Sequence, residues 1–249
     1  NNSYPYQFLM ENLQIQNNLI DGSLTVDVKK FIFLGSSCIY PKFAKQPLKE
    51  EYLLSDYLEP TNEWYAIAKI AGVKACHAIR KQFNKEYISL MPTNLYGYND
   101  NFDLNTSHVL PAMLRKFHEA KINNHSDVIL WGTGSPMREF LFVEDLAKSV
   151  VFSLENNLSE YIYNVGTGKD ISIKQLAYTI QKIVAHKGNI IWDSSKPDGT
   201  PRKLLDVSKI NRLGWNYNTN LEDGIIKTYK WFLENIENLK EVKIKWKLL

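Results

Sequence analysis

The sequence predicts an α/β fold built on a doubly wound parallel sheet. Helical spacing of apolar residues from about Tyr6 to Ile20 precedes the all-apolar run Phe31 to Leu34. The same order recurs in "TNEWYAIAKIAGVKACHAIRKQF", which predicts a long helix begun by Thr61 or Asn62, and in "EYISLMPTNLYG", which predicts a strand. Helices that alternate with buried strands are typical of a parallel sheet with helices on both faces.

The remainder of the chain predicts a second layer of elements. The segment from about Asn105 reads as a polar loop that leads into a helix, and no linker rich in glycine and serine divides the chain. We therefore expect the second domain to be interleaved with the first. Ser172 and Gln175 have the spacing of a capping box at the start of a helix. Further elements are expected at 127–155 (strand, glycine turn, strand, helix), 161–167 (strand), 172–184 (helix), 189–193 (strand) and 221–236 (helix).

Composition excludes several classes of protein. The 249 residues carry 44% hydrophobic side chains and a net charge of +3, which suits a globular protein better than a nucleic-acid binder. The two cysteines fit a reducing compartment, and no apolar run approaches the roughly 20 residues that cross a bilayer. We expect a cytoplasmic protein with no membrane contact and no metal site.

Two side chains of the long helix point to carbonyl chemistry. Tyr65 and Lys69 in "YAIAK" stand four residues apart, so they share one helix face. A tyrosine with a pKa near ~10 exchanges protons near neutrality only if a neighbouring cation stabilises its phenolate. Ser36, at the end of the preceding strand, can hydrogen-bond the same substrate oxygen. On spacing alone, a solvated Tyr and Lys is the alternative.

The motifs "GSSCIYP", "YAIAK", "PTNLYG", "WGTGSPMREF", "NVGTG" and "KPDGTPRKLLDV", in this order, resemble the extended short-chain dehydrogenase/reductase superfamily. More closely, they are similar to the GDP-L-fucose synthase family. This resemblance runs over nearly the whole chain. It implies an NADPH-dependent enzyme that epimerises GDP-4-keto-6-deoxy-D-mannose at C3 and C5 and then reduces C4.

Position by position, the resemblance implies that Ser36, Tyr65 and Lys69 form the reductase triad and that Cys38 and His108 form the acid and base pair for epimerisation. A hydrogen beside a ketone is acidic because the carbanion delocalises into an enolate, so its removal needs an oxyanion stabiliser at C4. A thiol with a pKa near ~8.5 and an imidazole near ~6.5 can exchange protons at neutral pH. Which of the two acts as the base is left open by the sequence.

The resemblance also implies two sets of binding residues. The cofactor NADP(H) is expected at the two strand ends, on Tyr65 and Lys69, and at His108. The strand-end residues are Leu34, Gly35, Ser36, Ser37, Pro92, Thr93, Asn94 and Leu95. The GDP-sugar is expected at Lys116, Trp131, Arg138 and Asp198, because a guanidinium can bind two pyrophosphate oxygens at once.

The expected domains are a partial NADP-binding Rossmann domain at 1–104 and 143–166 and a substrate domain at 105–142 and 167–249. A dinucleotide fold of this kind opens on a strand, a glycine fingerprint and a helix, and the sequence shows no such fingerprint. We therefore expect an N-terminally truncated sheet, and a chain that by itself binds NADPH weakly or is inactive. The resemblance further implies a homodimer that pairs the helix before Phe31 and the helix of Tyr65 with their copies.

Several alternatives stay open. Another superfamily enzyme, a nucleotide-sugar 4-epimerase or 4,6-dehydratase, would share the triad without needing Cys38 and His108, and a non-catalytic interaction module would need none of them. Without its context Cys38 is a small buried apolar residue, and Trp131 could be core packing. The glycine segments after Trp131 and Val165 are expected to be turns. We expect a structural Cys76 and surface positions for the other histidines, which are His77, His118, His125 and His186.

Overall fold

The computed structural model describes residues 4–239 and divides them between two compact units. The first unit contains residues up to 95 together with 139–170 and 202–218, and the second contains 96–138, 171–201 and the residues from 219 onward. Three of the boundaries fall within strands, namely β3 (Asn94–Tyr96), β5 (Met137–Phe142) and β7 (Asp170–Ser172). The predicted division into a cofactor domain and a substrate domain stays a prediction.

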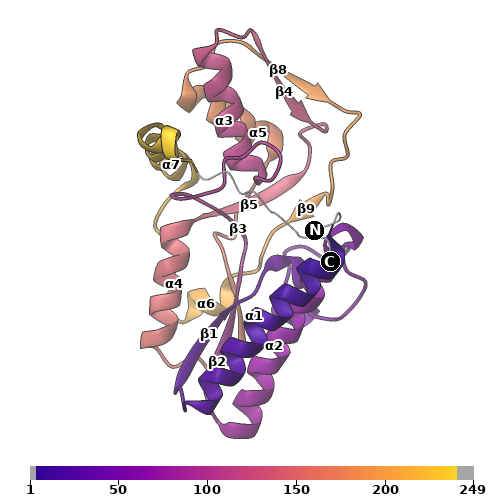
Figure 1. The fold of residues 1–249 in the computed structure, drawn as a ribbon, viewed down its shortest axis with the longest axis vertical. Coiled ribbons are helices and arrows are strands. Elements are labelled where there is room, and N and C mark those ends of the chain that lie inside the picture. The colour runs from indigo at the N-terminus through magenta and orange to yellow at the C-terminus, as the bar shows by residue number, and fades with distance from the viewer. Residues whose placement is uncertain (1–3, 240–249) are drawn as a thin grey trace. The chain divides into compact units, whose positions relative to one another are not determined.

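The first unit is built on a parallel sheet with the strand order β1-β2-β6. Leu34 pairs with Leu90 between β1 and β2, and Leu90 pairs with Tyr163 between β2 and β6. Helices α1 and α2 lie on one side of β1 and β2, and α4 lies on the other (Figure 1). The predicted α/β class with a parallel sheet is confirmed. The elements are α1 (Pro5–Thr25), β1 (Lys30–Leu34), α2 (Glu63–Phe83), β2 (Glu86–Pro92), α4 (Val143–Glu155), β6 (Ile162–Val165), β9 (Arg202–Lys203) and α6 (Ser208–Arg212), with 3₁₀ turns η1 (Ser37–Ile39), η2 (Glu50–Tyr52) and η3 (Pro60–Asn62).

Helix α2 approaches the sheet closely because it presents a glycine at the contact. A Cβ added at Gly72 would lie 2.3 Å from Cζ of Phe33 in β1, so a larger residue cannot occupy this position without a shift. On its other side α2 packs against α1, where the buried Gln16 donates a hydrogen bond to the carbonyl of Ala68 at 2.7 Å. A side-chain amide buried between helices needs such a partner.

A buried asparagine ties β6 to loops that are distant in sequence. Asn164 accepts a hydrogen bond from the hydroxyl of Tyr40, and its amide group donates to the carbonyls of Leu48 and Asp206. Its backbone N–H donates to the carboxylate of Glu50 at 2.9 Å. Because every group is satisfied, this network fixes the loops instead of straining the core.

The second unit contains a parallel pair of strands, β4 and β8, in which Asp127 pairs with Asn189 and Trp131 pairs with Asp193. Helix α5 packs against both α3 and α7. The capping box at Ser172 and Gln175 is confirmed, because each side chain bonds the other's backbone N–H. The elements are α3 (Val109–Ile122), β4 (Asp127–Trp131), α5 (Ile173–Val184), β8 (Asn189–Asp193), α7 (Leu221–Asn235) and the 3₁₀ turn η4 (Ile236–Asn238).

Two of the histidines expected at the surface are buried, so that expectation is wrong for them. Nδ1 of His118 lies 3.0 Å from the hydroxyl of Tyr229, and Nε2 of His186 lies 3.0 Å from the carbonyl of His125. Aromatic packing and these partners make the interior acceptable for an imidazole. The sequence also did not reveal β7, β9 or α6, which are short.

No helix among residues 4–239 is both long enough and apolar enough to cross a membrane. This statement covers the described part of the chain and agrees with the absence of a long apolar run in its sequence.

The same substitution is expected to have opposite effects in the two long helices of the first unit. Gly72→Ala should lower the free energy of unfolding by about 1–3 kcal/mol, because the new methyl group overlaps the Phe33 ring. Gly22→Ala in α1 should raise it by about 0.5–1 kcal/mol, because nothing lies within 4 Å of the new methyl group and the unfolded chain loses freedom. Urea unfolding of both variants measures these changes. Equal shifts of the two midpoints would contradict the close contact.

Candidate active site

The end of β1 lies very close to β2 because Gly35 has no side chain. Its N–H donates to the carbonyl of Leu90 at 2.9 Å, and an added Cβ would lie 2.2 Å from Cε of Met91. Ser36 follows as the cap of η1, where its hydroxyl accepts a hydrogen bond from the N–H of Cys38 at 3.3 Å. The turn therefore places Ser36 and Cys38 together at the carboxyl end of a parallel strand, where open α/β sheets bind their ligands.

Helix α2 brings Tyr65 and Lys69 to this same strand end. The ammonium of Lys69 donates a hydrogen bond to the carbonyl of Leu34 at 3.0 Å. It also lies 5.1 Å from the ring centre of Phe33 and 5.6 Å from that of Tyr65. The cation thus contacts both the strand and the tyrosine. The structure brings together Ser36, Cys38, Tyr65 and Lys69 within one unit.

Burial controls the protonation of these groups. It raises the pKa of Tyr65 to about 12, and a negative charge on Cys38 acts in the same direction. Burial also raises the pKa of Cys38, against the opposing effects of a hydrogen bond to Ser36 and of the charges on Lys203 and Lys69. For Lys69, burial lowers the pKa, and the Cys38 charge opposes this. A protonated phenol and a protonated thiol beside an ammonium group are suited to donating protons to a carbonyl oxygen or an enolate.

The predicted cofactor residues Pro92 to Leu95 begin at the last residue of β2, which neighbours β1 in the sheet. The N–H of Thr93 donates to the carbonyl of Val165 at 3.0 Å. The side chains of Thr93 and Asn94 both donate to the carbonyl of Glu139. The two predicted cofactor segments, Leu34 to Ser37 and Pro92 to Leu95, therefore lie at the carboxyl ends of adjacent strands.

The chemistry of these strand ends fits a nicotinamide nucleotide. Leu34, the last residue of β1, is 40% exposed and offers an apolar surface to a flat ring. Lys69 and Ser36 supply an ammonium and a hydroxyl at the same strand end, which suit ribose oxygens. Crevices outside the carboxyl ends of parallel strands are the usual place for such ligands.

Glu139 supports this edge, and its place in the "SPMREF" motif is the only sequence signal that pointed to it. The carboxylate is fully buried and accepts hydrogen bonds from the N–H groups of Thr167, Gly168 and Leu205 at 2.5, 2.7 and 2.9 Å. Burial raises the pKa of Glu139, while these hydrogen bonds oppose the rise. Two N–H groups of the "GTG" segment after Val165 therefore donate to a carboxylate of the same chain. This agrees with the expected turn.

His108 belongs to the second unit and occupies the cap position of α3. Its backbone carbonyl accepts a hydrogen bond from Ala112 at 3.1 Å, whereas its exposed imidazole makes no capping bond. The backbone of His108 is thus fixed at the start of α3. Its imidazole makes no capping hydrogen bond, so the ring is available for proton transfer.

Two of the predicted substrate residues, Lys116 and Trp131, lie together in the second unit. Trp131 is 67% exposed at the end of β4, so the core-packing alternative is wrong. The Lys116 ammonium donates a hydrogen bond to the carbonyl of Ile129 at 3.0 Å. The ring centre of Trp131 lies 5.9 Å from this ammonium and 5.6 Å from that of Lys196. An exposed indole between two cations can stack on a base while the cations attract phosphates.

Arg138 and Asp198 form the other half of this set. Asp198 accepts hydrogen bonds from the N–H and the hydroxyl of Thr133 at 2.7 and 2.8 Å, and these bonds lower its pKa. Burial lowers the pKa of Arg138, and the charge of Asp198 opposes this effect. Asp198 thus orders the turn after Trp131 and faces the positive charge of Arg138.

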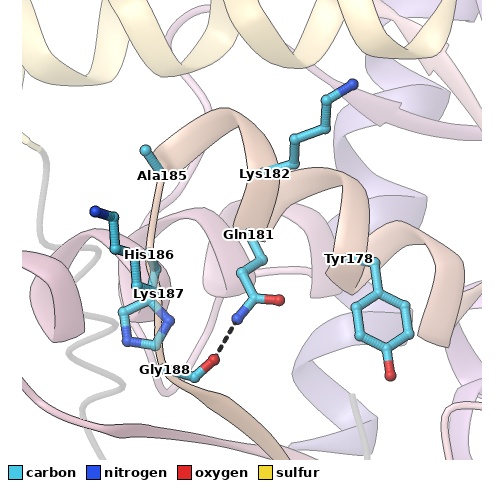
Figure 2. A pocket seen from close by; sticks show the side chains of 7 residues that line it. All are labelled: Tyr178, Gln181, Lys182, Ala185, His186, Lys187 and Gly188. Carbon is cyan, nitrogen blue, oxygen red and sulfur yellow. Dashed lines mark hydrogen bonds between the residues drawn. The ribbon is translucent and has the colours of Figure 1, made fainter.

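A shallow pocket in the second unit, shown in Figure 2, contains none of the predicted site residues. It lies at the end of α5, where Gln181 donates a hydrogen bond to the carbonyl of Gly188 at 2.7 Å. Its lining consists of Tyr178, Gln181, Lys182, Ala185, His186, Lys187 and Gly188.

A parallel α/β unit with serine, tyrosine and lysine at one strand end defines a protein of the short-chain dehydrogenase/reductase type. A family model described as the NAD dependent epimerase/dehydratase family matches residues 1–166, and the chain belongs to this family. Within it, the GDP-L-fucose synthases are close relatives. The chain is 55% identical over 238 residues to GDP-L-fucose synthase 1 of Arabidopsis thaliana, and 51% identical over 251 residues to GDP-L-fucose synthase of Escherichia coli. These alignments cover 96% of the chain in both cases, and 74% and 78% of the relatives.

Solved structures agree with this assignment. A GDP-L-fucose synthetase from Naegleria fowleri bound to NADP superposes with a TM-score of 0.89 at 31% identity, covering 96% of this chain and 76% of that one. A GDP-D-glycero-L-gluco-heptose synthase from Campylobacter jejuni, solved in the presence of NADPH, gives a TM-score of 0.84 at 36% identity, covering 94% and 78%. The resemblance seen in the sequence motifs is therefore confirmed at the level of the family and the fold.

The buried thiols are expected to react slowly with iodoacetamide, and faster as the pH rises. The thiolate is the nucleophile, so a raised pKa moves the rate increase to higher pH than in free cysteine, whose pKa is near ~8.5. Cys76 should react more slowly than Cys38, because it is fully buried and burial raises its pKa to about 12. Mass spectrometry of the chain and of its Cys38→Ser and Cys76→Ser variants separates the two sites. A Cys38 rate that levels off below about pH 8.5 would contradict the buried thiol.

Proposed function

We propose that the chain catalyses the NADPH-dependent conversion of GDP-4-keto-6-deoxy-D-mannose to GDP-L-fucose, by epimerisation at C3 and C5 followed by reduction at C4. The observation that carries this proposal is the grouping of a thiol, Cys38, with Ser36, Tyr65 and Lys69 at the end of β1. A reductase alone needs the last three residues. The thiol adds a group that can exchange a proton with carbon.

In the reduction, Tyr65 donates its phenolic proton to the C4 oxygen while Ser36 holds that oxygen by a hydrogen bond. The pKa of about 12 keeps the phenol protonated at neutral pH until the oxygen becomes basic enough to take the proton. Lys69, whose ammonium lies 5.6 Å from the Tyr65 ring centre, stabilises the phenolate that results. When bound at the ends of β1 and β2, NADPH would supply the hydride to C4.

In the epimerisation, the same hydroxyl groups stabilise an enolate at the C4 oxygen. Inversion requires that one group removes a proton from carbon and that another returns a proton to the opposite face. We assign these tasks to Cys38 and His108. The thiol of Cys38 is protonated at rest, so it must lose its own proton before it acts as a base.

The second unit supplies the groups that recognise GDP. Trp131 offers an exposed ring for the base, and Lys116 stands beside it as a cation. Arg138 suits the pyrophosphate because its guanidinium can bind two oxygens at once, and Asp198 faces it. These roles follow from the chemistry of these side chains and from the names of the relatives.

A nucleotide-sugar 4-epimerase or 4,6-dehydratase is the alternative that uses the same triad. Such an enzyme would not need the Cys38 thiol for catalysis. A non-catalytic module would need neither this thiol nor the contact between Lys69 and Tyr65. The test is incubation with GDP-4-keto-6-deoxy-D-mannose and NADPH, using a chain joined at its N-terminus to the glycine-fingerprint segment that opens a dinucleotide fold. Formation of GDP-L-fucose supports the main proposal, and formation of GDP-4-keto-6-deoxy-D-mannose from GDP-mannose would instead indicate the dehydratase.

Two substitutions are expected to separate the two halves of the reaction. Tyr65→Phe should slow reduction of the epimerised ketone by about 10²–10⁴-fold, because the proton donor to C4 is lost. Cys38→Ser should slow deuterium uptake from solvent at C3 and C5 by at least about 100-fold, while the epimerised ketone is still reduced. Nuclear magnetic resonance of the sugar and NADPH absorbance measure the two halves.

Tyr178→Phe and Cys76→Ser are the matched controls, because neither residue belongs to the proposed site. Unchanged reduction in Tyr65→Phe would remove Tyr65 as the acid. Unchanged deuterium uptake in Cys38→Ser would contradict the role of Cys38 in the epimerisation.

We further propose a cytoplasmic homodimer that pairs α1 and α2 with their copies. These two packed helices expose large apolar side chains that a second copy can cover. Ile15 and Leu19, four residues apart in α1, are 62% and 59% exposed. Trp64 and Ile67 in α2 are also exposed.

Sedimentation equilibrium is expected to give twice the monomer mass. Exchange of Ile15 and Leu19 for arginine should shift the chain to the monomer, because two charges would then face an apolar surface. Ile226→Arg, at an exposed position of α7, is the control. A monomer mass for the unsubstituted chain would remove the homodimer.

A further inference from the structure

The loop that follows β8 carries a cation that belongs to neither of the two predicted sets of binding residues. Lys196 is exposed, and its ammonium lies 5.6 Å from the ring centre of Trp131. Within residues 4–239 this ammonium forms no ion pair, so the indole is the group beside which the structure places it. Such a cation beside an exposed aromatic ring suits an anionic ligand that also carries an aromatic group.

Two anchors hold this loop against the turn that follows β4. At one end, the carbonyl of Asp193 accepts hydrogen bonds from the N–H groups of Gly132 and Lys196 at 2.9 and 3.2 Å. At the other end, the carboxylate of Asp198 accepts the N–H and the hydroxyl of Thr133. Lys196 lies between the two anchors. Its backbone is therefore fixed beside the end of β4, and its proximity to the indole is a property of the fold.

The same indole has a second cation beside it. Lys116 approaches from α3, and its ammonium lies 5.9 Å from the ring centre. Asp193, the acid at the start of the loop, accepts hydrogen bonds from the hydroxyl and the N–H of Ser195, and these lower its pKa more than the charge of Lys196 does. Two positive charges beside one ring repel each other, and a ligand with two negative charges offsets this repulsion.

We propose that Lys196 binds the diphosphate of a nucleotide whose base stacks on Trp131, and that it thereby selects a nucleoside diphosphate over the free nucleoside. This inference deepens the function proposed above and rests on it. An ammonium suits the task because it carries three N–H donors on a flexible stem and can follow the oxygens of either phosphate. The indole then recognises the base, and Lys196 recognises the charge.

The test is calorimetric titration of the full chain and of its Lys196→Gln variant with GDP and with guanosine. The substitution should raise the Kd of GDP about tenfold, because a charged hydrogen bond to phosphate is lost. The Kd of guanosine should stay the same, because the ring of Trp131 is retained. Added salt should reduce the difference in the Kd of GDP, since ions screen an exposed ammonium. Lys196→Arg should restore most of the affinity for GDP.

Two further variants serve as controls. Lys187→Gln removes the same charge from the same unit, at the pocket shown in Figure 2, and should leave both Kd values unchanged. Trp131→Ala should raise the Kd of GDP and that of guanosine by the same factor, because it removes the ring on which the base stacks.

An unchanged Kd of GDP in Lys196→Gln overturns the inference. An equal rise in the Kd of guanosine overturns it as well, because a disturbed loop and not a lost phosphate contact would then explain the change. Absence of GDP binding to the unsubstituted chain has the same consequence. If ADP binds as tightly as GDP and loses the same factor in Lys196→Gln, the phosphate contact is supported whereas the GDP-linked substrate of the proposed function is contradicted.

Discussion

The hydrogen bond from Lys69 to the carbonyl of Leu34 is the contact on which the candidate active site depends. It joins the helix that carries Tyr65 to the strand end that carries Ser36 and Cys38. The bond is possible because Gly72, one turn further along α2, lets the helix rest on the ring of Phe33. A side chain at Gly72 would push α2 away from the sheet. Tyr65 and Lys69 would then no longer be held close to the end of β1. Packing in the core thus sets the geometry of the chemistry.

Two buried polar residues, Asn164 and Glu139, attach distant segments of the first unit to its sheet. Asn164 binds the carbonyl of Asp206, and the carboxylate of Glu139 binds the N–H of Leu205. The backbone around residue 205 is therefore held from both sides, and its isolated bridge to Leu48 completes the contact. This explains why 202–218 packs with the parallel sheet although it lies late in the chain. The same carboxylate fixes the loop after β6, and the Glu139 carbonyl receives the side chains of Thr93 and Asn94.

The sequence predicts well those features that depend on neighbours along the chain. The helices α1, α2, α5 and α7, the strands β1, β4 and β6, and the capping box at Ser172 follow from local periodicity and from hydrogen bonds between nearby residues. The prediction fails where long-range partners decide. His118 is buried because Tyr229 and Phe232 surround it, and Glu139 is buried because three backbone amides from distant loops satisfy it. The strands β7 and β9 are too short to show a period. In the site, spacing put Tyr65 and Lys69 on one face, but only the fold shows how closely the strand end meets them.

The charges around Lys69 favour a reaction order in which this ammonium stabilises first an anion on Cys38 and then an anion on Tyr65. A negative charge on Cys38 raises the pKa of Tyr65, so the thiolate and the phenolate oppose each other's formation. Lys69 acts on Cys38 and contacts the ring of Tyr65, so it can stabilise either anion but gains little from both at once. In the proposed reaction, a negative charge on Cys38 during proton exchange with carbon would hold Tyr65 in the protonated form that the reduction needs. The phenol would then give up its proton in the reduction, once Cys38 is again a neutral thiol.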